Sequence, residues 1–441
     1  MTTLVASRSH IQRLAVVVAL FVGLAWVLGE FVGSTEGYIM QAVVIVGLLG
    51  MLSLVIFWLA ARSDPEGPTL FAVLFVSFAL KLTAAYYRSV SGLFADAYAY
   101  YHAGRGIAAQ LAGGEWPELS SYTGTNLMRL AAGVALFGAG DTFLGVTFLW
   151  AWFALIGMLL FYKAFVTAFP EGNRRLYLFL VLLYPSLLLW TGSLGKDAPM
   201  MFFGGMAAYG LARSRRALGI GGLALLVAGI AGMFALRPHM GAALTVAVGA
   251  SFVIHPVRAG AMTPAVRLTT LVAFGAVAIV VAIIGSRLVG LESLELGDIQ
   301  AFIGGRQGGG QRHLLGVGEA GASAFTPVDT RSPLGLAILI PTVLFRPFPW
   351  EVHNQNALIT SLEGLGLMAL IVYRFRSVRA AILGAAQNPF LLTSVLYALM
   401  VIYVFSALAN FGLIARQRVQ IFPYVFMWIA YLAQGRRSEG G

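Results

Sequence analysis

The chain contains no cysteine, which excludes disulfides, a thiolate nucleophile and any metal centre built on cysteine ligands. Charge is also scarce, because Asp, Glu, Lys and Arg together make up 11% of the 441 residues, whereas hydrophobic residues make up 59%. A soluble protein of this length would need two or three domains, each with a polar surface. So few charged residues cannot cover such surfaces, so the composition excludes a soluble fold.

Several catalytic motifs are missing as well. The sequence has no phosphate-binding G-x-x-x-x-G-K-[ST] loop, no H-E-x-x-H zinc motif and no G-x-S-x-G nucleophile turn. The six histidines are scattered and acids are sparse, so we expect no cofactor and no metal site. A divalent cation shared by Asp96 and Asp197 is the one alternative, and the sequence does not favour it.

Apolar runs of about 20 residues, the length that crosses a bilayer core, recur from one end of the chain to the other. They predict an all-α, polytopic transmembrane bundle. The first run, Leu14–Val32, is too long for the apolar region of a signal peptide, so we interpret it as a retained helix. The net charge of +11 indicates cytoplasmic anchoring, anionic lipid or an anionic substrate rather than nucleic acid.

The positive-inside rule predicts about twelve spans with both termini cytoplasmic, and no internal repeat is visible. The predicted spans are about 13–33, 38–60, 69–87, 142–165, 175–192, 199–212, 218–236, 240–256, 268–289, 357–373, 389–410 and 418–435. Two further apolar segments, Leu127–Phe137 and Leu334–Leu344, are too short to span and are predicted to be re-entrant or interfacial external helices.

We expect the chain to form one integral membrane domain with three parts. Two leading helices occupy 1–68, and a core over 69–240 carries an external loop at 88–141. The C-terminal helices occupy 241–441 and carry a glycine-rich external loop at 290–356.

The stretch Arg88–Arg105, RSVSGLFADAYAYYHAGR, holds one acid among aromatic and cationic residues. If it is helical, Asp96 and Tyr100 share a face at i, i+4. A carboxylate there can take a proton from an acceptor hydroxyl, which makes Asp96 a candidate catalytic residue. Tyr98, Tyr100 and Tyr101 would line a sugar or lipid path. The alternative is an exposed loop acid or a helix cap.

Four more polar constellations lie at predicted helix ends. Trp190 precedes the Lys196-Asp197 pair, and Arg237 and His239 flank a proline. RPFPWE (346–351) is followed by His353, and NFGLIARQR (410–418) carries Arg416 and Arg418. Arginine presents a planar fork that suits phosphate oxygens. The alternative is snorkelling to lipid headgroups. The candidate phosphate-binding residues are Arg88, Arg105, Lys196, Arg237, His239, Arg346, Arg416 and Arg418.

Within RPFPWE and the following helix, Glu351 and His353 are further candidates for the catalytic base, and Trp350 for stacking on a sugar ring. Asp197 and Glu363 are predicted to orient their neighbours. Glu363 lies about two turns inside a predicted span, where a carboxylate is costly unless it is paired, so we expect an arginine partner.

Helix order and the Asp96 loop over about 69–240 resemble the GT-C class of integral membrane glycosyltransferases. This resemblance implies a polyprenyl-phosphate-sugar donor and gives Asp96 the role of base. The usual acidic D-E pair is here Asp96-Ala97, and two helices precede the matching core. The C-terminal half, with its glycine-rich loop, RPFPWE and NFGLIARQR, resembles bacterial O-antigen or exopolysaccharide polymerases. These families imply glycan transfer on the outer face of the bacterial cytoplasmic membrane.

The leading hypothesis is a glycosyltransferase that moves a sugar from a polyprenyl-phosphate donor to a glycan or lipid acceptor. The nearest alternative is a polysaccharide polymerase that uses undecaprenyl-pyrophosphate glycans. A transporter or lipid flippase is a further alternative. Transporters commonly show inverted repeats and ionisable residues at the bilayer midplane, whereas most ionisable residues here fall at predicted helix ends. A non-catalytic membrane scaffold is the last alternative function.

Overall fold

A computed structural model describes residues 38–91, 95–216, 219–255, 333–352, 355–405 and 411–432. Within these ranges the regular structure is helical and contains no strand. Three described helices are long and apolar enough to cross a membrane, α2 (Tyr38–Ala61), α3 (Gly67–Val90) and α6 (Phe143–Ala168). The prediction of a helical protein with apolar helices of spanning length is confirmed. The count of twelve spans and the side of the termini stay predictions, and the spans at 13–33 and 268–289 lie outside the described residues.

The chain divides into two compact units. Unit 1 runs to Phe153 and takes in Thr191–Ala198, whereas unit 2 comprises Ala154–Trp190 and the chain from Pro199 onward. The continuous helix α6 therefore contributes to both units. The segment Thr191–Ala198 contains two of the predicted site residues, Lys196 and Asp197.

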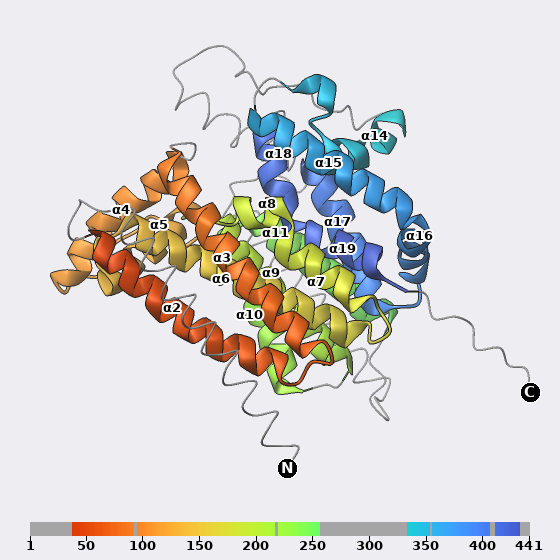
Figure 1. Cartoon of the computed structure of the whole chain (residues 1–441), viewed down its shortest axis with the longest axis horizontal. Helices are drawn as coiled ribbons and strands as arrows, with labels where there is room; N and C mark the ends of the chain where they lie inside the picture. The colour runs from red at the N-terminus through yellow and green to blue at the C-terminus, as the bar shows by residue number, and fades with distance from the viewer. Residues whose placement is uncertain are drawn as a thin grey trace, which may run out of the picture. The chain divides into compact units, whose positions relative to one another are not determined.

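In unit 1, α2 and α3 lie side by side (Figure 1). One face of α2 is buried, including Val46, Leu49 and Phe57, and Ser53 on that face accepts a hydrogen bond of 2.8 Å from Trp152 Nε1. The opposite face carries exposed apolar side chains at helical spacing, namely Val44, Leu48, Met51, Val55 and Trp58. An apolar stripe facing outward is the pattern of a helix that borders lipid.

The predicted external loop of unit 1 is a helical hairpin of α4 (Ala95–Ala112) and α5 (Gly124–Ala139). The short helix predicted at 127–137 is therefore real, but it pairs with a second helix that starts beside Asp96. The two helices approach closely, because a methyl group at Gly104 would lie 3.0 Å from the Cβ of Ala132, and one at Gly133 would lie 2.6 Å from the Cβ of Ile107. Neither α4 nor α5 meets the length and hydropathy expected of a span.

Unit 2 differs from the prediction chiefly in broken helices. The segment predicted as one helix at 175–192 is α7 (Arg174–Leu183) and α8 (Pro185–Trp190), interrupted at Tyr184, where the proline was expected to cause a kink. The helix predicted at 357–373 agrees with α15 (Gln355–Tyr373), and the difference is a second helix, α16 (Phe375–Gly384), that follows it after a bend of 75°.

The prediction of one continuous helix at 418–435 is wrong. The chain there forms α18 (Phe411–Gln417), the short 3₁₀ turn η2 (Arg418–Gln420) and α19 (Phe422–Ala430). Pro423 cannot donate a backbone hydrogen bond and so favours the first turn of a new helix. Of the predicted span, the described residues form an α-helix only over Phe422–Ala430, because Arg418–Gln420 takes a 3₁₀ turn and the helix ends before Tyr431.

The core of unit 2 surrounds α19, in which every residue is buried. Tyr177 donates to the carbonyl of Pro423 at 3.1 Å, and Trp428 donates to Ser394 at 2.8 Å. These two bonds tie α19 to α7 and to α17 (Pro389–Phe405). The remaining helices are α9 (Asp197–Arg216), α10 (Ile220–Leu236), α11 (Pro238–Ile254) and α14 (Pro333–Phe345). α14 has 13 residues, too few to span, as predicted for 334–344.

Candidate functional site

Unit 1 buries two cations on one helix. Lys81 and Arg88 lie seven residues apart on α3, so they share a face about 10 Å apart along the helix axis. They are 1% and 3% exposed, respectively. The amine of Lys81 donates to the hydroxyl of Thr191, which holds the segment Thr191–Ala198 against α3. Buried cations in an apolar helix are costly and mark functional positions.

Lys196 and Asp197 belong to this same unit. Lys196 Nζ donates to Thr125 Oγ1 at 3.1 Å, at the start of α5. Asp197 is 2% exposed and stands in the first turn of α9, where a negative charge complements the helix dipole. Arg88, Lys196 and Asp197 are thus predicted site residues that share unit 1 with Lys81.

Asp96 lies in the first turn of α4 and is exposed, so the predicted helical reading of this stretch is confirmed. Tyr98 donates to the carbonyl of Ser89 at 2.8 Å and stacks on Phe143 with ring centroids 4.5 Å apart. Tyr100 is buried at 8% exposure. Tyr98 is therefore fixed by a hydrogen bond and a ring contact, whereas Tyr100 is fixed by burial. Tyr98 is the more exposed of the two.

Arg105 forms an ion pair of 2.9 Å with Asp141, which also accepts a hydrogen bond of 2.6 Å from the hydroxyl of Tyr101. Asp141 is not among the site residues predicted from the sequence. Because this carboxylate follows α5 while Arg105 and Tyr101 are on α4, the network closes the base of the hairpin, and a structural role accounts for both predicted site residues.

The guanidinium of Arg418 is the most heavily buried charge in unit 2. The residue is 0% exposed and stands in η2, at the break between α18 and α19. Its Nη1 donates to the carbonyls of Leu344 at 3.0 Å and Arg346 at 2.7 Å, which caps the end of α14. Its Nε and Nη2 are buried and have no hydrogen-bond partner among the described residues.

Arg237 is the second buried cation of unit 2. It is 7% exposed at the junction of α10 and α11, and its Nη1 donates to Gln417 Oε1 at 3.3 Å. Gln417 directly precedes Arg418 in the chain. Arg237 therefore contacts the residue next to Arg418, at the break between α18 and α19. His239, in the first turn of α11, is half-buried, as is Arg416 in the last turn of α18.

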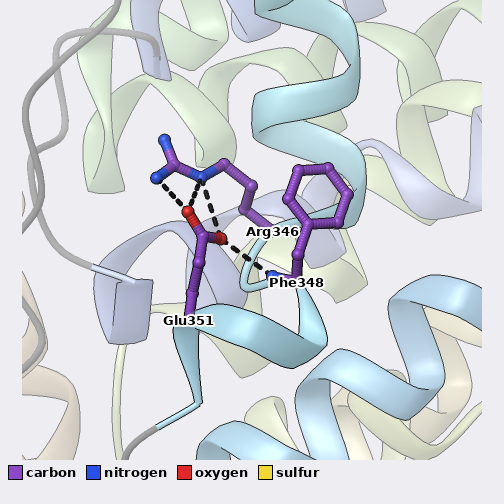
Figure 2. A network of polar contacts seen from close by, with 3 residues as sticks. All are labelled: Arg346, Phe348 and Glu351. Carbon is purple, nitrogen blue, oxygen red and sulfur yellow. Dashed lines mark hydrogen bonds and ion pairs between the residues drawn. The ribbon is translucent and has the colours of Figure 1, made fainter.

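Arg346 and Glu351 form a clamp around η1 (Pro349–Glu351), as Figure 2 shows. Arg346 Nε lies 2.9 and 3.1 Å from the two carboxylate oxygens, Arg346 Nη2 donates to Glu351 Oε1, and the amide of Phe348 donates to Glu351 Oε2 at 2.8 Å. Burial alone would raise the pKa of Glu351, but these hydrogen bonds and the charge of Arg346 lower it below its ordinary value.

Two aromatic rings extend from this clamp. Trp350 is 79% exposed and stacks on Phe348 with ring centroids 4.9 Å apart. The pair presents a broad aromatic face, which is the property that suggested Trp350 as a sugar-stacking residue. His353 lies outside the described residues.

Glu363 finds a different partner from the one predicted. Its Oε1 accepts the amide hydrogen of Ser186 at 2.7 Å, and its Oε2 accepts the Ser186 hydroxyl. No described arginine forms an ion pair with it, although the charge of Arg418 is within electrostatic reach. The bonds bridge α15 to the first turn of α8, where Pro185 leaves the Ser186 amide outside the ladder of α7. Trp190, at the end of α8, is half-buried.

The predicted site residues therefore fall into two sets. Unit 1 holds Arg88, Asp96, Tyr98, Tyr100, Tyr101, Arg105, Lys196 and Asp197, and unit 2 holds Trp190, Arg237, His239, Arg346, Trp350, Glu351, Glu363, Arg416 and Arg418. The described part of the chain contains no group of three or more His, Asp or Glu residues placed to hold a metal ion. No protein-family model, no curated protein and no solved structure matches the chain.

Proposed function

We propose that the protein is an integral membrane glycosyltransferase that uses a polyprenyl-linked sugar donor and holds the donor's phosphate with buried cations. The observation that carries this proposal is Arg418, fully buried with two nitrogen donors that have no partner among the described residues. Leaving buried donors of a charged group without acceptors costs free energy, even though Nη1 of the same guanidinium is bonded. A bound anion removes that cost.

The capping role of Arg418 does not account for its burial. One nitrogen, Nη1, makes both hydrogen bonds to the end of α14. The N–H groups of Nε and Nη2, on another edge of the planar guanidinium, take no part in this capping. That pair of donors is the fork which binds a phosphate or carboxylate through two parallel hydrogen bonds. In an apolar helical unit, the phosphate of a lipid-linked substrate is the anion with reason to be present.

Two versions of the reaction differ in the donor. In the monophosphate version, Asp96 takes the proton of the acceptor hydroxyl as that oxygen attacks the anomeric carbon, and the bond from this carbon to the phosphate oxygen breaks. Arg88 and Lys196 of the same unit would stabilise the departing phosphate. Lys81, which the sequence analysis did not assign to the site, adds a buried charge to this set.

The pyrophosphate version, that of a polysaccharide polymerase, is favoured by a specific feature of unit 2. Arg237 donates to Gln417, the residue next to Arg418 at the break between α18 and α19. Arg418 in turn donates to the carbonyl of Arg346. Several cations in one place suit the larger charge of a pyrophosphate. Glu351 is bound by Arg346 and its lowered pKa makes it a weak base, so Glu363 or His353 is the better base in this version.

The test is binding and transfer by the purified full-length protein. Native mass spectrometry would compare undecaprenyl phosphate with undecaprenyl pyrophosphate, and transfer would be followed from each lipid carrying a sugar. Arg418→Lys keeps the charge but removes the fork. Because a hydrogen bond to a charged group contributes about 1.5–3 kcal/mol, we expect lipid binding to weaken about 10- to 100-fold.

Arg174→Lys is the matched control, because Arg174 also donates to a backbone carbonyl in unit 2, that of Pro170 just past the end of α6, at 3.0 Å. Loss of binding in both variants would show that capping, rather than anion binding, is what matters. Binding of either lipid without any sugar transfer would instead support the transporter or flippase alternative. Asp96→Asn abolishes transfer in the monophosphate version and leaves it intact in the pyrophosphate version.

A further inference from the structure

The tip of the α4–α5 hairpin carries two exposed aromatic rings that the site described above does not use. Trp116 is 64% exposed and Tyr122 is 47% exposed. Trp116 Nε1 donates to the hydroxyl of Tyr122 at 3.3 Å, and that hydroxyl donates to the carbonyl of Pro117 at 3.2 Å. The polar atoms of the two rings are therefore engaged with the tip, and the ring faces are what the tip offers to a partner.

The tip is built to hold these rings in place. The amide of Gly114 donates to Leu111 at 3.1 Å, and the amide of Glu115 donates to Gln110 at 2.9 Å, so the chain turns sharply at the end of α4. Gly114 has φ of +78°, a left-handed conformation that favours glycine. Pro117, whose carbonyl accepts from Tyr122, is buried. An aromatic pair fixed before binding loses little freedom when a ligand arrives.

Hydrogen-bonding groups border the rings. Asn126 Nδ2 donates to Ser120 Oγ at 3.0 Å and to Ser121 Oγ at 3.3 Å, and Arg129 Nη1 donates to Asn126 Oδ1 at 3.2 Å. Serine hydroxyls and an amide can each both donate and accept hydrogen bonds. The neighbouring residue, Thr125, is the one bound by Lys196, which places a cation at the edge of the same tip.

We propose that the hairpin tip is a saccharide-binding site that holds the glycan part of the substrate. A sugar ring has an apolar C–H face that stacks on an aromatic ring and hydroxyls that bond to amides, hydroxyls and carboxylates. The tip supplies each of these, on Trp116, Tyr122 and the Asn126 network. The identity of the ligand as substrate rests on the proposed function, whereas the existence of the site rests on the tip alone.

A membrane anchor is the other use of exposed Trp and Tyr, and the neighbours of Trp116 argue against it. Glu115 and Glu118 flank the Trp116-Pro117 dipeptide and are both exposed. Two carboxylates beside the ring would meet repulsion from anionic lipid and a desolvation cost on insertion. The same carboxylates accept hydrogen bonds from sugar hydroxyls.

The experiment measures saccharide binding by the full-length protein in lipid nanodiscs. Saturation-transfer NMR would use hexasaccharides of glucose, galactose, mannose and N-acetylglucosamine as probes. We expect at least one to bind, and Trp116→Ala to weaken that binding at least about tenfold. Trp116→Phe keeps a ring face and should bind within about threefold of the unmodified protein. Trp58→Ala, which removes another exposed Trp, 53% exposed on α2, should bind normally.

Three outcomes would overturn the proposal. None of the four probes binds the unmodified protein, or binding survives in Trp116→Ala, or Trp116 contacts lipid. The last is measured with brominated lipids, whose quenching should be the same in the unmodified protein and in Trp116→Phe, because the difference between them reports the Trp116 indole.

The binding measurement separates this proposal from the proposed function. If sugar transfer from polyprenyl-linked donors is absent but Trp116→Ala loses a bound hexasaccharide, the tip is a saccharide site on a protein with another activity. If transfer is present and depends on Arg418 while Trp116→Ala changes neither saccharide binding nor transfer, the proposed function stands and the tip site is wrong.

Discussion

At the scale of single residues, the clamp between Arg346 and Glu351 makes a prediction about pH. The folded-state pKa of Glu351 lies below its ordinary value of 4.5, so the ionised form stabilises the folded protein above that value. This stabilisation is lost as the pH falls through the lowered folded-state pKa. We expect Glu351→Gln to reduce the free energy of unfolding by about 1–3 kcal/mol at neutral pH, with the difference from the unmodified protein vanishing in strong acid.

Thermal unfolding of the detergent-solubilised protein, followed by tryptophan fluorescence between pH 3 and pH 7, measures the difference in stability between Glu351→Gln and the unmodified protein. Glu171→Gln, on an exposed turn after α6, is the control and should parallel the unmodified protein. A Glu351→Gln midpoint that stays below the unmodified one by the same amount at every pH would mean that the carboxylate charge is not what stabilises the clamp.

Which residues carry charge inside apolar surroundings can be read from the sequence, but what they contact cannot. Glu363 was predicted to need a partner, and the partner is Ser186, 177 positions away in the chain. Asp141 binds Arg105 across a hairpin that periodicity alone did not predict. Arg418 and the tip tryptophan Trp116 gain their interest from burial and exposure, which depend on tertiary structure and leave no local pattern.

At the scale of helices, the α4–α5 hairpin depends on one close contact that a matched pair of glycines can test. A methyl at Gly133 would lie 2.6 Å from the Cβ of Ile107, whereas one at Gly138 on the same helix meets nothing within 4 Å. We expect Gly133→Ala to destabilise the protein by about 1–3 kcal/mol through overpacking. Gly138→Ala should be neutral or stabilising by up to about 1 kcal/mol, because alanine favours helix.

Thermal midpoints of the two alanine variants decide between these expectations. The double variant Gly133→Ala with Ile107→Ala should recover part of the loss, since it removes the Cγ2 methyl of Ile107, which the new methyl would meet most closely, although Cβ remains. Equal midpoints for Gly133→Ala and Gly138→Ala would show that the helices do not need this approach, and the position of the hairpin tip would then lose its structural basis.

The helices themselves were largely predictable, and their breaks were predictable only where proline marks them. Apolar runs of spanning length gave the positions of α2, α3 and α6, and Pro185 explains the interruption at Tyr184. The 75° bend between α15 and α16 occurs at Arg374 without a proline. There the arginine donates to the carbonyl of Ile429 in α19, a tertiary contact that no local sequence rule anticipates.

At the scale of the molecule, the division into units does not follow the order of the chain. Thr191–Ala198 leaves its neighbours in unit 2 to join unit 1, held by Lys81 through Thr191 and by Thr125 through Lys196. Sequence reasoning grouped Lys196 with Asp96 by a resemblance to a family. The structure places Lys196 and Asp96 in the same unit, and it places Arg237, Arg346, Arg416 and Arg418 in unit 2.

The membrane topology of unit 1 yields a prediction that the absence of cysteine makes simple to test. α3 has 24 residues, about 36 Å of helix, and crosses once if it spans. The hairpin that follows it has no helix of spanning character. Ser63→Cys before α3 and Glu118→Cys at the hairpin tip should therefore react with a membrane-impermeant maleimide from opposite sides of sealed vesicles. Leu48→Cys, on the exposed apolar face of α2, should react from neither.

A third position distinguishes the ways in which this could fail. Gly138→Cys lies near the end of α5, past the tip, and should react from the same side as Glu118→Cys. If these two react from opposite sides, the hairpin itself crosses the bilayer. If Ser63→Cys and Glu118→Cys react from one side while Gly138→Cys agrees with them, α3 does not cross, and the tip then lies with the α2–α3 turn. Only reaction of Glu118 and Gly138 from the side opposite Ser63 leaves the tip where a glycan on the far side of the membrane can reach it.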